Sequence, residues 1–139
     1  SNRINRRTID ATVDGLPKGF STGNLVAGLT LGFWVHLSDR SREAVIWRSG
    51  LYKAWPKGTN RAELQERLYG ILRVRNRVAH SERLFGPKRL ELSPKKVDAD
   101  AIELLGLLCP EATDYLYGED GAPIGKFLNE HPAPVAVEL

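Results

Sequence analysis

Apolar residues recur at helical spacing along most of this chain, and no stretch alternates between apolar and polar residues as a half-buried strand does. Glycine and proline lie between the periodic stretches. The pattern therefore predicts an all-α protein, a helical bundle of about five helices over residues 1–118. The Gly/Pro-rich tail, residues 119–139, is expected to be extended or disordered.

The expected helices cover residues 3–14, 21–37, 42–55, 60–81 and 97–117, the last with a break at Cys109-Pro110. The stretch 21–37 is apolar nearly all round, which predicts a central helix or one in an interface. Within it, Gly28 and Gly32 would let another helix approach closely.

The helix at 60–81 carries the clearest amphipathic pattern. Thr59 or Asn60 is expected to cap its start, with Glu63 placed for a capping box. Its expected buried stripe consists of Leu64, Leu68, Ile71, Leu72, Val78 and Ala79.

The chain has 139 residues, of which 42% are hydrophobic and 27% charged, and this length and composition fit one globular domain. The single cysteine, Cys109, cannot form an internal disulfide, so a cytoplasmic location is expected. No membrane span is expected, because the longest apolar run, 25–37, is too short. No metal-ligand spacing and no cofactor motif is present.

Because the chain contains no methionine, we expect that a native segment precedes it and that Ser1-Asn2 is a cloning remnant.

Positive charge is concentrated in one segment. Residues 59–90 hold eight Lys/Arg against three acids, whereas the whole chain has a net charge of +3. A local basic excess is typical of a protein with a polyanionic partner, although a solvated arginine-rich helix face would give the same pattern.

The stretch "RNRVAHSERLF", residues 75–85, combines cations with an amide and a histidine. At 100° per residue, Asn76 and His80 lie on one helix face, and Arg75 is long enough to reach around from its own position. RNA cleavage without a metal needs such groups. Histidine transfers protons near neutral pH, and arginine binds phosphate oxygens as a bidentate fork. One histidine cannot easily act as both base and acid, so a single copy provides half a site.

This stretch, together with "LTLGFWVHL" upstream and "LLGLLCPEATDYL" downstream, resembles the Abi-like (abortive-infection-like) proteins of the HEPN superfamily. The resemblance covers about residues 26–116. Relatives often have a second histidine directly after the first, whereas His80 is followed here by Ser81.

The resemblance implies a helical bundle that forms a homodimer with a composite active site. The implied activity is a metal-independent endoribonuclease that leaves 2′,3′-cyclic phosphate and 5′-OH ends, in phage defence, toxin–antitoxin or stress systems. His80 would be the acid/base group, Arg75 the phosphate stabiliser and Asn76 the positioning residue. The flanking RNA backbone would be held by Arg73, Arg77 and Arg83. RNA is then the expected partner, with an antitoxin or regulatory protein as a possible second one.

Two other classes of function stay open. The chain would be a non-catalytic RNA-binding or partner-binding module if the basic helix only supplies affinity and His80 merely packs or hydrogen-bonds. The other class is a purely structural dimerisation bundle.

Overall fold

The computed structural model describes residues 2–84, 93–118 and 123–131, and the secondary structure of these residues is entirely helical, which confirms the all-α prediction. The α-helices are α1 (Asn2–Asp14), α2 (Thr22–Gly28), α3 (Leu31–His36), α4 (Arg61–Ala79), α5 (Pro94–Leu108), α6 (Pro110–Tyr117) and α7 (Pro123–Glu130). Three short 3₁₀ or π-helical turns, η1 (Arg40–Arg42), η2 (Glu43–Trp47) and η3 (Leu51–Ala54), connect α3 to α4.

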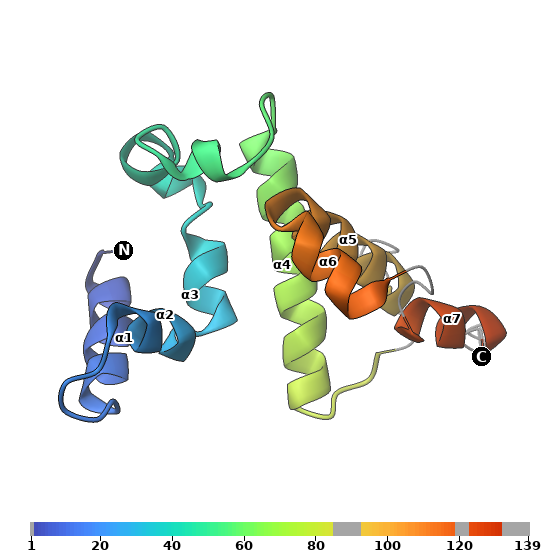
Figure 1. The fold of residues 1–139 in the computed structure, drawn as a ribbon, viewed down its shortest axis with the longest axis horizontal. Coiled ribbons are helices and arrows are strands. Elements are labelled where there is room, and N and C mark those ends of the chain that lie inside the picture. Colours follow the sequence, from blue (N-terminus) through green and yellow to red (C-terminus); the bar gives the residue numbers. More distant parts are fainter. Residues whose placement is uncertain (1, 85–92, 119–122, 132–139) are drawn as a thin grey trace, which may run out of the picture.

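Helix α4 stands between two groups of helices (Figure 1). α3 packs on one side of α4, with α1 and α2 beyond it, and α5 packs on the other side, where it also contacts α6 and α7. The turns η1–η3 lie at the N-terminal end of α4 (Figure 1). Helix α4 therefore joins the two groups of helices.

The start of α4 follows the prediction. Asn60 is the N-cap, and its side-chain oxygen accepts hydrogen bonds from the backbone N–H groups of Ala62 and Glu63. The Asn60 amide also donates to the Glu63 carboxylate over 3.1 Å. These contacts satisfy backbone donors that the first turn leaves unpaired, so the helix start is well defined.

The predicted helix at 21–37 is instead two helices. Leu29 is extended, and the Thr30 hydroxyl accepts a hydrogen bond from the Phe33 N–H, which starts α3 anew. A threonine hydroxyl that bonds to a nearby backbone N–H can favour such a cap over helix continuation. Only Val35 of this stretch is fully buried, so the stretch as a whole is not a central helix of the single chain.

The predicted helix at 42–55 is also wrong, because η1–η3 replace it. The Ser49 hydroxyl donates to the Val45 carbonyl, and Gly50 interrupts the turns. Val45 is 74% exposed, so the apolar positions do not form one continuous docking face. Without such a face, short helical turns are not stabilised as one helix.

The buried core is small. Val35, Leu64, Val97 and Leu104 are its fully buried apolar side chains among the described residues. In the predicted stripe of α4, Leu64 is buried and Leu68, Ile71 and Leu72 are half-buried. Val78 and Ala79 are exposed, because α4 continues past the parts of α3 and α5 that cover it. The prediction of an extended or disordered tail is wrong for Pro123–Glu130, which form α7, and residues 119–122 and 132–139 lie outside the described residues.

Candidate functional site

Arg75, Asn76 and His80 lie in the last turns of α4. The guanidinium of Arg75 donates to the side-chain oxygen of Asn76 over 3.2 Å. His80 is the C-cap residue, and its backbone N–H donates to the Asn76 carbonyl over 3.0 Å. The structure thus brings Arg75 and Asn76 together, while among the described residues no hydrogen bond joins Arg75 to the His80 side chain.

The helix ends at His80 through a defined reversal of the chain. The Ser81 N–H donates to the Val78 carbonyl, and the Glu82 N–H donates to the Arg77 carbonyl over 2.8 Å. Ser81 has a φ of 54°, the left-handed conformation that follows many helices. His80 is exposed at this point. The backbone of His80 is therefore fixed while its imidazole remains accessible to a ligand.

The predicted RNA-binding arginines also surround the end of α4. Arg73 is exposed and has no ion-pair partner among the described residues. Arg77 donates to the Arg83 carbonyl over 3.4 Å, and its Nε lies 4.0 Å from a Glu82 oxygen. Contacts of this length at the surface add little stability, so these cations remain available for an anion.

A polar stripe continues from His80 towards the start of α4. Tyr69, Arg73, Asn76 and His80 are spaced by four, three and four residues, which places them on one face of the helix. We call these four residues the polar stripe.

Tyr69 belongs to a hydrogen-bonded cluster that the sequence analysis did not identify. Its hydroxyl oxygen lies 2.8 Å from His36 Nδ1 and 3.0 Å from Asp39 Oδ1. His36 Nδ1 lies 3.0 Å from the other Asp39 oxygen, and Gln65 donates to Asp39 over 3.1 Å. The i,i+3 spacing of His36 and Asp39 was visible in the sequence, but their contact with Tyr69 depends on the packing of α3 against α4.

Charge and burial both act on this cluster. Burial and the hydrogen bond to Asp39 raise the pKa of Tyr69, although the charges of Arg73 and Arg42 act in the opposite direction. The phenol therefore stays protonated and can donate a hydrogen bond. His36 and Tyr69 also meet edge to face, with ring centroids 5.6 Å apart, so the cluster holds α3 onto α4.

The opposite side of α4 is held by ion pairs. The Arg67 guanidinium donates to Asp100 over 2.9 Å and to Glu103 over 2.7 Å, and Lys96 donates to the same Asp100 over 2.6 Å. Burial would lower the pKa of Arg67, but the bonds to Glu103 and the charge of Asp100 outweigh it and raise that pKa. This network attaches α5 to α4.

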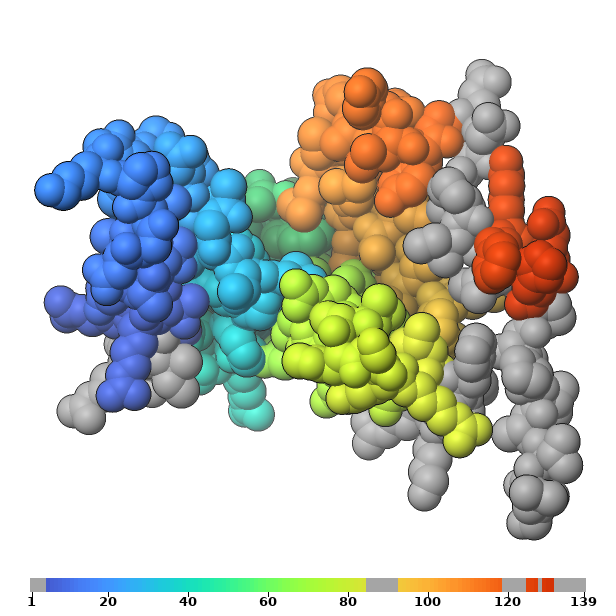
Figure 2. All heavy atoms as spheres, turned by 90° about the horizontal axis from the view of Figure 1, so that it is seen from below, coloured from blue at the N-terminus to red at the C-terminus, as the bar shows by residue number. Residues whose placement is uncertain are grey.

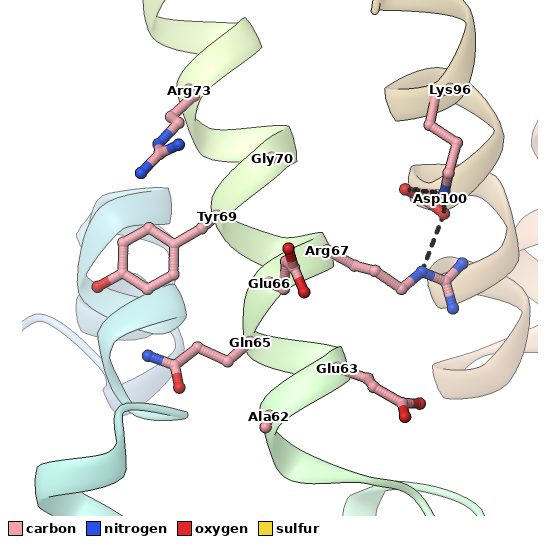
Figure 3. Close-up of a pocket in the computed structure, with 10 residues that line it drawn as sticks. All are labelled: Ala62, Glu63, Gln65, Glu66, Arg67, Tyr69, Gly70, Arg73, Lys96 and Asp100. Atoms are coloured by element: carbon pink, nitrogen blue, oxygen red, sulfur yellow. Dashed lines mark hydrogen bonds and ion pairs between the residues drawn. The ribbon is translucent and has the colours of Figure 1, made fainter. Parts of the chain in front are cut away.

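A groove of about 680 Å³ runs across α4 between these two sides. Figure 3 shows Gln65, Tyr69 and Arg73 directed towards α3, whereas Arg67 points towards Asp100 on α5. Three cations and three acids line it: Arg67, Arg73, Lys96, Glu63, Glu66 and Asp100. Because these charges balance, the groove is not a favourable path for a polyanion.

The C-terminal end of α4 is uncovered. In Figure 2 it faces the viewer between the first helices and the last ones. Apolar side chains are exposed on it and on α2 and α3, including Val78 at 58%, Val26, Leu31 and Trp34. The single chain therefore presents apolar side chains that an interface could cover.

In residues 2–84, 93–118 and 123–131, no group of three or more His, Cys, Asp or Glu side chains is arranged to hold a metal ion. Over these same ranges, no helix has the length and apolar character needed to cross a membrane.

Comparison of the chain with models of protein families, with curated proteins and with solved structures gave no match. The resemblance to Abi-like HEPN proteins thus stays a prediction from the sequence blocks quoted above, and the membership of the helices in that particular bundle is likewise a prediction.

Proposed function

We propose that the chain is a metal-independent endoribonuclease of the HEPN type, acting as a homodimer. The observation that carries the proposal is the end of α4, where Arg75 is bonded to Asn76 and His80 is exposed one helical turn further on. The resemblance assigns its roles to these same three residues.

The proposed chemistry is transesterification within the RNA. A base removes the proton of a ribose 2′-OH, and the 2′-oxygen attacks the adjacent phosphorus. The bond from phosphorus to the 5′-oxygen then breaks, and an acid protonates that oxygen, which leaves a 2′,3′-cyclic phosphate and a 5′-OH. His80 would act as base or acid, and Arg75 would stabilise the negative charge of the phosphorane. Asn76 would orient the Arg75 guanidinium through the observed hydrogen bond.

A dimer supplies what one chain lacks. Two proton transfers at opposite oxygens need two acid/base groups, and His36 cannot be the second one near His80. His36 contacts Tyr69, and Tyr69 precedes His80 by eleven residues. Tyr69 is therefore about 16 Å from His80 along the axis of α4. Two-fold pairing of the ends of α4 would bring a second His80 to the site. The exposed apolar side chains Val78, Leu31 and Trp34 would then be covered.

The non-catalytic alternative is an RNA-binding module with the same basic end of α4. It is favoured by one observation: among the described residues, nothing forms a hydrogen bond with the His80 imidazole to orient it for proton transfer. In that case His80 would contribute only a small part of the affinity. A biological role in phage defence, toxin–antitoxin or stress response, with a regulatory protein as partner, rests on the family resemblance alone.

Incubation of the purified protein with structured and single-stranded RNA, in buffer that contains EDTA, tests the proposal. We expect cutting that survives the chelator, with cyclic phosphate at the 3′ end of one product and 5′-OH on the other. Loss of cutting in EDTA with recovery on adding Mg²⁺ or Mn²⁺ would contradict the metal-free scheme. Binding without cutting on every RNA would favour the non-catalytic module.

A further inference from the structure

A second pocket lies at the start of α4, at the opposite end of that helix from His80. It is formed by η2, η3 and the turn that follows, and its volume is about 570 Å³. Three aromatic and three basic residues line it: Trp47, Tyr52, Trp55, Arg48, Lys53 and Lys57. No acidic residue is among its lining residues, unlike the charge-balanced groove in Figure 3.

The rings of this pocket have no aromatic partner within the described chain. The ring contacts found there join Phe33 to Trp34, His36 to Tyr69, and Phe127 to His131. Trp47 and Trp55 are half-buried, which holds them in place, whereas Tyr52 is 46% exposed. Trp55 also lines a smaller cavity together with Leu104 and Leu107 of α5. Anchored rings without a stacking partner are suited to bind another flat, conjugated group.

The cations add a preference for negative charge. Arg48 is bound to Glu43 over 2.8 Å, and the same carboxylate also binds Arg61 over 3.2 Å. In the part of the chain that the structure describes, Lys53 and Lys57 have no carboxylate partner. A ligand with a planar ring and an adjacent negative charge would satisfy both features, and an unpaired nucleotide has this chemistry.

We propose that this aromatic-basic pocket binds an unpaired nucleotide of single-stranded RNA, with a base on the rings and a phosphate near Lys53 and Lys57. The site does not depend on cleavage. The 19 residues of α4 place it about 28 Å from the end that carries His80. It would hold the RNA by a base that is not paired, at a distance from the bond that is cut.

The test measures the affinity of a short oligoadenylate by fluorescence anisotropy, in a His80→Ala background so that the probe stays intact. Adding Tyr52→Ala should weaken binding by roughly 5- to 150-fold, the usual range for removal of one stacking ring. Tyr115→Ala is the matched control, because Tyr115 is 89% exposed on α6, away from the pocket, and it should change nothing.

Two further measurements separate stacking from charge. Trp47→Leu should weaken binding without changing its salt dependence, and the probe should quench tryptophan fluorescence less than it does in the parent protein. Changing Lys53 and Lys57 together to glutamine should reduce the slope of log affinity against log salt by about 0.7 units, the contribution of one phosphate on a single strand. Equal affinity for Tyr52→Ala and its parent, or equal affinity for oligoadenylate and a blunt duplex, would overturn the proposal. Neither result depends on whether the wild-type protein cuts RNA.

Discussion

The arginines of α4 differ between the two halves of the helix. In the N-terminal half, Arg61 donates to the Ser38 carbonyl over 2.8 Å and to Glu43 over 3.2 Å, and Arg67 is bound by Asp100 and Glu103. In the C-terminal half, Arg73 has no ion pair among the described residues, and Arg75 reaches only the amide of Asn76. The ion pair of Arg77 in this half is a long one, 4.0 Å from the exposed Glu82.

The difference indicates two uses of one residue type. A guanidinium that is half-buried among carboxylates holds helices together, and an anion would have to compete with those carboxylates for it. A guanidinium without a carboxylate partner keeps its donors free for phosphate. The division coincides with the change from buried helix to exposed helix end, so the same helix would hold the fold at one end and bind RNA at the other.

The largest expected effect belongs to His80→Ala. Loss of an acid/base group should lower the rate of RNA cleavage by about 10² to 10⁴-fold, and the melting temperature should stay the same because the side chain is exposed. His131→Ala is the matched control, since His131 is also exposed but follows α7. Melting, RNA affinity and product formation should be measured on one preparation. A collapse of the melt together with the activity would show that His80 is a structural residue.

Arg67→Ala should affect the fold and not the RNA. It leaves Asp100 with Lys96 alone and removes both bonds to Glu103, which should lower the free energy of unfolding by about 2 kcal/mol. Arg73→Ala, on the same helix, should leave the free energy of unfolding nearly unchanged. Chemical denaturation of the two variants side by side checks this contrast. Equal losses of stability in both would remove the division between the two halves.

Changing Arg73 and Arg77 together to glutamine should act on RNA affinity. The slope of log affinity against log salt on single strands should fall by about 1.4 units, which is about sevenfold over a fourfold change in salt. Lys95→Gln, an exposed change at the start of α5, serves as control. An unchanged slope for the double variant would mean that the RNA is bound elsewhere and that this helix end is only solvated.

Ser81→Gly should have the smallest effect. A serine with φ of 54° is strained, and glycine is the residue that most often follows a helix in this conformation. The free energy of unfolding should rise by up to about 1 kcal/mol, with cleavage unchanged. A loss of stability, measured by denaturation, would contradict the chain reversal described after His80.

How far the sequence predicts this molecule depends on whether the deciding contacts are local. The cap at Asn60, the helix α4 and the break at Cys109 all follow from neighbouring residues, and the structure confirms them. The break at Leu29 was not predicted, because the apolar residues on both sides of Thr30 have the spacing of one continuous helix. In the structure Thr30 is instead the N-cap of a new helix. The turns η1–η3 were missed because their apolar residues have helical spacing but no common docking face.

The same limit applies to the candidate site. Asn76 and His80 could be placed on one face from spacing alone, and the bond between Arg75 and Asn76 is between neighbours. The contact of Tyr69 with His36 and Asp39 joins residues about thirty positions apart, so only the packing of α3 on α4 reveals it. Val78 and Ala79 were wrongly expected in the core. The spacing of apolar residues shows which face of a helix is apolar, but it does not show whether another element covers that face.

The most direct test of the composite site is a titration of wild-type protein with His80→Ala protein. The two forms are co-expressed with different tags, so that mixed dimers form, and cleavage is measured at constant total protein. If each site needs His80 from both chains, only wild-type pairs cut, and activity falls with the square of the wild-type fraction. An equal mixture should then retain about a quarter of the activity. Retention of about half, in proportion to the wild-type fraction, would contradict the composite site and place cleavage within a single chain.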